Sequence, residues 1–135
     1  MSRLGVGLAD TSIFIAREDG RPLGELPERL AVSVVTIGEL QLGVLSATDA
    51  ETRARRADTL ALARGADPLP ISEPVMVTWA RLVWDCRRAD VHRAVRLTDA
   101  LIAATAIEHG LTVITQDADF EALAVASDDL AVARI

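Results

Sequence analysis

The sequence predicts an α/β fold: a three-layer α/β/α sandwich built on a mostly parallel central sheet. Short apolar runs rich in β-branched residues alternate along the chain with segments in which apolar residues recur at helical spacing. Strands that alternate with helices in this way are typical of a parallel sheet covered by helices. The 135 residues contain no internal repeat or long linker, so we expect one domain spanning residues 1–135.

Four short apolar runs are the expected strands of this sheet. They cover residues 5–9, 30–33, 111–115 and 130–135. The run at 111–115 is apolar and β-branched, as expected of a strand that is covered on both faces. Residues 67–71 contain two prolines, and the sequence leaves open whether they form a short strand or an extended segment.

Helical spacing of apolar residues indicates helices between these strands. The expected helical segments are residues 13–16, 34–47, 50–64, 73–89, 97–109 and a last turn at 119–126. Thr11 or Ser12 is the expected cap of the first helix, and Ser72 caps the one at 73–89. Gly110 is expected to end its helix, because glycine adopts a positive φ without a Cβ clash.

The composition excludes several classes of function. The net charge of −6 argues against a protein that coats nucleic acid by bulk electrostatics, although local contact with phosphates stays open. All 14 basic residues are arginine, so lysine nucleophiles, Schiff bases and P-loop lysines are excluded. A single cysteine, and the lack of any apolar run near the ~20 residues of a membrane span, lead us to expect a cytoplasmic protein.

Acidic residues stand at the ends of several expected elements. They are Asp10 after the first strand, Glu39 on the following helix, Asp99 at a helix start, and Asp117 and Asp119 after the strand at 111–115. Parallel sheets bind ligands at the carboxyl ends of their strands, so these side chains can meet at one edge. Clustered carboxylates repel one another unless a cation lies between them, and Mg²⁺ or Mn²⁺ prefers such oxygen ligands. The sequence therefore indicates a candidate divalent-cation site.

Each acid also has a purely structural explanation. Residues 36–39 match a capping box in which Glu39 only caps a helix, and Asp99 is favoured at a helix N-terminus by the dipole. Asp10 lies in a common strand-to-turn junction, and Asp117 fits ordinary loop chemistry. For any one acid the structural explanation is the stronger. The presence of acids at four element ends makes a purely structural explanation of all of them less satisfactory.

Four segments around these acids resemble the PIN-domain nucleases, specifically the VapC-type toxins of bacterial toxin–antitoxin pairs. They are Asp-Thr-Ser at 10–12, Ser-Val-Val-Thr-Ile-Gly-Glu-Leu at 33–40, Asp-Ala-Leu-Ile-Ala-Ala-Thr-Ala at 99–106, and Thr-Gln-Asp-Ala-Asp-Phe at 115–120. Each segment is a weak signal alone, but their order and spacing together are specific. The resemblance implies Mg²⁺-dependent (or Mn²⁺-dependent) endonucleolytic cleavage of RNA, inhibition by a cognate VapB-type antitoxin, and a homodimer.

The resemblance also assigns roles to residues. By position, Asp10, Glu39 and Asp99 would be metal-binding, catalytic acids. Asp117 would be the fourth, and Asp119 is the alternative because relatives vary in this loop. The hydroxyl side chains expected to orient acids or water are Thr11, Ser12 and Thr115.

A basic segment leads into Asp99. Residues 81–97 contain five arginines and two aspartates, a local balance of +3. The candidate RNA-binding side chains in this segment are Arg87, Arg88, Arg93 and Arg96. A solvated helix face paired with the surplus of acids explains these arginines equally well.

Other functions remain open from the sequence. A PIN-fold binding module with little activity would act mainly through its antitoxin, which in relatives docks between the helices expected at 34–47 and 50–64. A response-regulator-like acidic pocket is disfavoured, because that chemistry needs a lysine. A phosphatase of the Asp-x-Asp-x-Thr type is disfavoured because Phe120 follows Asp119. The sequence does not identify the RNA, the bond cleaved, or whether one or two metal ions act.

Overall fold

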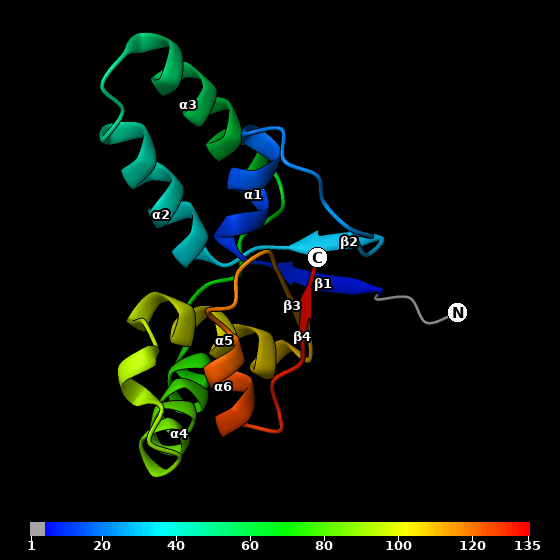
Figure 1. Ribbon diagram of the computed structural model, residues 1–135, viewed down its shortest axis with the longest axis vertical. Coiled ribbons are helices and arrows are strands. Elements are labelled where there is room, and N and C mark those ends of the chain that lie inside the picture. The colour runs from blue at the N-terminus through cyan, green and yellow to red at the C-terminus, as the bar shows by residue number, and fades with distance from the viewer. Residues whose placement is uncertain (1–4) are drawn as a thin grey trace.

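The computed structural model describes residues 5–135, which place one parallel sheet between two layers of helices (Figure 1). The sheet has the strand order β2-β1-β3-β4, and every neighbouring pair is parallel. Its strands are β1 (Val6–Ala9), β2 (Arg29–Ala31), β3 (Thr112–Thr115) and β4 (Val132–Arg134). The predicted three-layer α/β/α class is confirmed, and the described sheet is parallel throughout.

Six α-helices in the described residues cover the two faces of the sheet. They are α1 (Thr11–Glu18), α2 (Val34–Leu45), α3 (Ala50–Arg64), α4 (Glu73–Arg88), α5 (Leu97–His109) and α6 (Glu121–Ala126), with a 3₁₀ turn η1 (His92–Ala94) before α5. Figure 1 shows α1, α2 and α3 on one side of the sheet and α4, α5 and α6 on the other. Across residues 5–135, no helix combines the length and the apolar character that crossing a bilayer requires.

Alternation along the two central strands divides the core between the layers. Leu8 of β1 and Val113 of β3 pack in the cluster with α4, α5 and α6, whereas the next residues, Ala9 and Ile114, pack with α1, α2 and α3. Successive side chains of a strand point to opposite faces, so both faces of these strands are buried. This double burial is the reason that the apolar run at 111–115 could be identified as a strand.

The cap of α1 differs from the sequence-based prediction. Asp10 is the N-cap, and its Oδ1 accepts a hydrogen bond from the Ser12 backbone N–H at 3.1 Å. The expectation that Thr11 or Ser12 caps this helix was therefore wrong. Asp10 retains extended backbone angles from β1, so the helix begins earlier than predicted, and a candidate catalytic acid doubles as its cap.

The start of α2 differs from the capping box that residues 36–39 suggested. Ser33 is the N-cap, and its hydroxyl accepts a hydrogen bond from the Val35 N–H at 3.0 Å. The capping-box interpretation of Thr36 and Glu39 was wrong, because Thr36 lies inside the helix rather than at its cap. The segment at 67–71 is extended and contributes only an isolated parallel bridge between Leu69 and Ser33.

Among the glycines that the structure describes, Gly7 is the one whose added Cβ would approach a neighbouring side chain most closely. A Cβ at this position would lie 2.5 Å from Ile114 Cγ1 and 3.1 Å from Pro27 Cγ. Gly7→Ala should therefore lower the free energy of unfolding by about 1–3 kcal/mol, the usual cost of overpacking a core. Urea denaturation measures this change.

Gly38 provides the matched control for that substitution. Its added Cβ would meet no atom within 4 Å, and Gly38 lies inside α2. Gly38→Ala should raise the free energy of unfolding by about 0.5–1 kcal/mol through helix propensity. Equal effects of the two substitutions would contradict the packing assigned to Gly7.

Candidate active site

The predicted acids gather around one cleft at the carboxyl edge of the sheet. This cleft has a volume of about 470 Å³. The residues lining it are Asp10, Thr11, Ser12, Ile15, Arg21, Glu39, Leu42, Arg96, Asp117 and Asp119. Asp99 is not among the lining residues, and its side chain is buried next to the cleft behind Arg96. The topology therefore brings together residues that are separated by more than 100 positions in the chain.

Asp10 is the most firmly held of these acids. It follows β1, is only 4% exposed, and is tied to β3 by a hydrogen bond from its backbone N–H to the Ile114 carbonyl at 3.0 Å. Its Oδ2 accepts hydrogen bonds from the Ser12 hydroxyl at 2.8 Å and from the Thr115 hydroxyl. Three donors, counting the Ser12 N–H, fix the orientation of this carboxylate.

The same two hydroxyls hold the loop that follows β3. Thr115 Oγ1 accepts a hydrogen bond from the Asp117 N–H at 3.0 Å, and Ser12 Oγ accepts one from the Gln116 N–H at 3.0 Å. Ser12 and Thr115 thus connect the start of α1 with the end of β3. These bonds position Asp117 relative to Asp10, and the orienting role that the resemblance implies for the two hydroxyls stays a prediction.

Glu39 reaches the cleft from α2 and is held by Thr11. The Thr11 hydroxyl lies 2.6 Å from Glu39 Oε1 and 3.1 Å from Thr36 Oγ1. Thr36 is fully buried and was not predicted as a site residue. Its spacing from Glu39 is a usable signal, because residues three apart share a helix face, although the same spacing also matches the alternative capping-box explanation.

Asp99 lies in the first turn of α5, is 3% exposed, and forms an ion pair with Arg96. Arg96 Nε donates to Asp99 Oδ2 at 3.1 Å, and Arg96 Nη2 donates to Asp99 Oδ1 at 3.4 Å. Burial raises the pKa of Asp99 above its ordinary value, and the opposing effect of Arg96 does not cancel this shift. The charges of Asp10 and Asp119 raise this pKa further.

Asp117 and Asp119 approach the cleft from the loop after β3. Burial raises the pKa of Asp117, and the neighbouring charges of Asp10 and Asp119 raise it further. Asp119 is about half exposed and lies 3.6 Å from Arg96, measured from Oδ2 to Nη2. Both acids line the cleft, so the choice between them as the fourth metal ligand stays a prediction.

These raised pKa values predict how stability depends on pH in metal-free protein. An aspartate with a raised native pKa binds its proton more tightly when folded, so stability falls as pH rises from about 4 through the raised value. Asp117→Asn removes this cost and should become progressively more stable, relative to the unsubstituted protein, over that range. Urea unfolding in the presence of a chelator, at a series of pH values, measures the difference.

Asp49 offers a control of opposite sign. Its hydrogen bonds from Thr52, first from the backbone N–H, lower the pKa of this carboxyl. Its charge therefore stabilises the fold above about pH 4, and Asp49→Asn should lose stability relative to the unsubstituted protein as pH rises. The difference in free energy of unfolding between Asp117→Asn and the unsubstituted protein should rise with pH. A difference that does not change with pH, or that falls as it does for Asp49→Asn, would contradict the raised pKa of Asp117.

The donor atoms of the cleft suit a hard divalent cation. Its acids offer only oxygen, and the charges of Asp10 and Asp119 act on both Asp99 and Asp117. Within residues 5–135, however, no group of three or more acidic, histidine or cysteine side chains is already arranged to hold a metal ion. The carboxylates are held instead by Ser12, Thr115 and Arg96, so metal binding would require some of these contacts to rearrange.

The four candidate RNA-binding arginines are not all at the cleft. Arg87 and Arg88 end α4 and Arg93 lies in η1, and all three are exposed outside the cleft. Arg96 lines the cleft and binds Asp99. Arg21 also lines it and was not predicted from the sequence, because it lies in a loop far from the basic segment.

The PIN domain family model matches residues 8–126, which include every acid of the cleft. This chain is a PIN-domain protein. It is 69% identical over 103 residues to Ribonuclease VapC8 of Mycobacterium tuberculosis, covering 76% of this chain and 92% of that relative. It is also 47% identical over 121 residues to Ribonuclease VapC4 of the same species, with 86% of this chain and 89% of that relative covered.

Solved structures agree with this family assignment. A toxin–antitoxin structure of M. tuberculosis, VapBC-5, superimposes with a TM-score of 0.85 at 38% identity, covering 97% of this chain and 99% of that one. The VapBC2 structure of Rickettsia felis, bound to a DNA fragment from its promoter, has a TM-score of 0.76 over 96% of this chain and 98% of that chain. At 17% identity, that second likeness shows the fold alone. The predicted resemblance to VapC-type proteins is confirmed.

Proposed function

We propose that this PIN-domain protein is a metal-dependent endoribonuclease that acts as the toxin of a toxin–antitoxin pair. The observation that carries the proposal is the cleft itself, in which Asp10 is oriented by Ser12 and Thr115 and shares the cleft lining with Glu39 and Asp117. The relatives named ribonucleases VapC8 and VapC4 supply the reaction class, the hydrolysis of RNA.

The side chains of the cleft have separate roles in this proposal. Asp10, Asp99 and Asp117 would hold Mg²⁺ or Mn²⁺ with Glu39, and Asp119 is the alternative to Asp117. A cation bound there would supply Lewis-acid stabilisation of the charge that develops on the phosphate oxygens. A carboxylate of the cleft accepts the proton of the attacking water, and the hydroxyls of Ser12 and Thr115 keep Asp10 in its orientation.

Cleavage of RNA should depend on both the cation and these acids. Asp10→Asn and Asp99→Asn should each lower the cleavage rate by at least about 100-fold, because each removes a charge that holds the metal. A chelator should abolish cleavage, and Mg²⁺ or Mn²⁺ should restore it. Gel assays on a mixed RNA pool measure the rates, and circular dichroism confirms that each variant is folded.

Asp128 is the matched control, since it is exposed and lies outside the cleft. Asp128→Asn should cleave RNA at the unsubstituted rate. Cleavage that survives in both Asp10→Asn and Asp99→Asn, or that ignores the chelator, would refute the catalytic assignment. A folded, unsubstituted protein that cleaves no RNA would favour the binding-module alternative.

The exposed arginines before α5 form the second part of the proposal, as a rim for RNA phosphates. Simultaneous replacement of Arg87, Arg88 and Arg93 by Ala should weaken RNA binding and reduce its salt slope. Each lost phosphate contact changes the slope by about 0.7 for a single strand, so we expect a change of about 2. Binding of catalytically inactive Asp10→Asn protein to labelled RNA, at several salt concentrations, measures this slope.

Arg64 is the control for the rim, because it is exposed at the end of α3 on the other side of the sheet. Arg64→Ala should leave the salt slope unchanged. An unchanged slope in the triple variant would show that these arginines are a solvated helix face.

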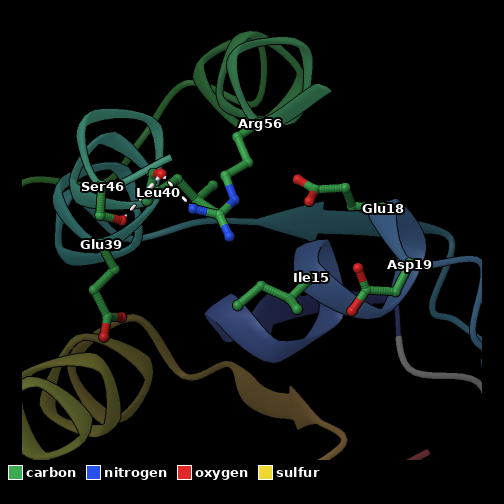
Figure 2. Close-up of a pocket in the computed structure, with 8 residues that line it drawn as sticks. Ile15, Glu18, Asp19, Glu39, Leu40, Ser46 and Arg56 are labelled. Atoms are coloured by element: carbon green, nitrogen blue, oxygen red, sulfur yellow. Dashed lines mark hydrogen bonds between the residues drawn. The ribbon is translucent and has the colours of Figure 1, made fainter. Parts of the chain in front are cut away.

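The antitoxin docks, in our proposal, on the groove between α1, α2 and α3. This groove has a volume of about 330 Å³ and shares Ile15 and Glu39 with the acidic cleft. Figure 2 shows Glu18 and Asp19 at the end of α1, with Arg56 reaching in from α3. Carboxylates beside apolar side chains suit a partner segment that is both basic and apolar. The likeness to VapBC-5, a member of a family of toxin–antitoxin systems, supports an antitoxin as the partner.

A further inference from the structure

Arg96 occupies an unusual position at the start of α5. It is the N-cap residue, where Ser, Thr, Asp or Asn normally accepts a hydrogen bond from the helix, and its side chain makes no such bond. Its guanidinium instead turns along the first turn of α5 and binds Asp99, with Asp119 beside it. The local role of a cap is thus replaced by a role in the acidic cleft.

The geometry of this pair engages the whole Asp99 carboxylate. Nε lies 3.1 Å from Oδ2 and Nη2 lies 3.4 Å from Oδ1, so the planar fork of Arg96 spans both oxygens. Within residues 5–135, Arg96 is the cation that pairs with Asp99. Asp10 is held by hydroxyl and backbone donors, whereas in these residues Arg96 is the partner that offsets the burial of the Asp99 carboxylate.

A divalent cation and this guanidinium require the same carboxylate. A metal ion bound through Asp99 would approach an oxygen that now accepts an Arg96 hydrogen bond, and two cations a few ångströms apart repel in a partly buried site. The two therefore compete for Asp99. Arg96 is able to leave, because its side chain is 64% exposed and Asp119, its second partner, is 48% exposed.

We infer that Arg96 is a tethered competitor of the divalent cation, holding Asp99 in the metal-free protein and yielding it when the cation binds. Arg96 thereby lowers the affinity of the cleft for metal, and it keeps the negative charge of Asp99 paired when no metal is bound. This inference rests on the proposed function, because it takes Asp99 as a metal-holding acid. It assigns to Arg96 a role toward the metal that the other arginines before α5 do not share.

The inference is tested by metal binding in the absence of RNA. Arg96→Gln keeps a long polar side chain but removes the competing charge, and it should bind Mn²⁺ about tenfold more tightly than unsubstituted protein. Isothermal titration calorimetry on chelator-stripped protein measures both affinities. A second expected consequence is a larger rise of the melting temperature of Arg96→Gln at a fixed Mn²⁺ concentration, since tighter binding stabilises the folded state more.

Arg21→Gln is the matched control, because Arg21 lines the same cleft but pairs with Asp19 rather than with Asp99. It removes one positive charge that acts on Asp117 but does not release Asp99, so its gain in Mn²⁺ affinity should be clearly smaller than that of Arg96→Gln. Equal gains in Arg21→Gln and Arg96→Gln would overturn the inference in favour of a general charge effect. No gain in Arg96→Gln would overturn it directly.

A spectroscopic readout follows the guanidinium itself. In ¹H–¹⁵N spectra of unsubstituted protein, saturating Mg²⁺ should move the Arg96 Nε–H resonance to the position of a solvated arginine. A resonance that stays in place at saturation would overturn the inference while leaving the proposed metal dependence intact. If neither the unsubstituted protein nor Arg96→Gln binds Mn²⁺ or Mg²⁺, the proposed metal dependence fails and the inference fails with it.

Discussion

The hydrogen bonds that fix Asp10 are the interaction on which the rest of the site depends. This carboxylate caps α1 by accepting a hydrogen bond from the Ser12 N–H, and it also accepts hydrogen bonds from the hydroxyls of Ser12 and Thr115. Those hydroxyls in turn accept the backbone N–H groups of the loop that carries Asp117. One acid therefore joins the end of β1, the start of α1 and the end of β3. Loss of its orientation would disturb local structure and chemistry together.

The second constraint is the mutual repulsion of the acids. Burial and neighbouring charge raise the pKa values of Asp99 and Asp117, so the folded protein tolerates these carboxylates at a cost in stability. Arg96 offsets part of that cost at both residues, and Arg21 offsets part of it at Asp117. A site that binds a cation tightly must leave some negative charge unsatisfied, and such sites often reduce the stability of the protein that contains them.

Several features of the fold could be predicted because they depend on local sequence. The bounds of α3, the cap Ser72 of α4 and the αL residue Gly110 after α5 follow from nearby residues alone. Predictions failed where a residue served two elements at once. Asp10 both pairs with β3 through its backbone N–H and caps α1, and cap preference alone does not distinguish Asp10 from Ser12. Thr36 was overlooked for a related reason, since its partner Thr11 belongs to a different helix.

The sequence by itself determined the α/β class, the acids at the element ends and the resemblance to PIN-domain nucleases. These follow from periodicity, cap chemistry and the order of short motifs, all of which are local along the chain. Only the tertiary structure decided which arginines reach the acids. Arg93 and Arg96 are three residues apart, yet Arg93 faces solvent while Arg96 lies in the cleft. That difference arises because Arg96 is the cap residue of α5, and the packing of this helix on the sheet brings Arg96 against Asp99 and Asp119.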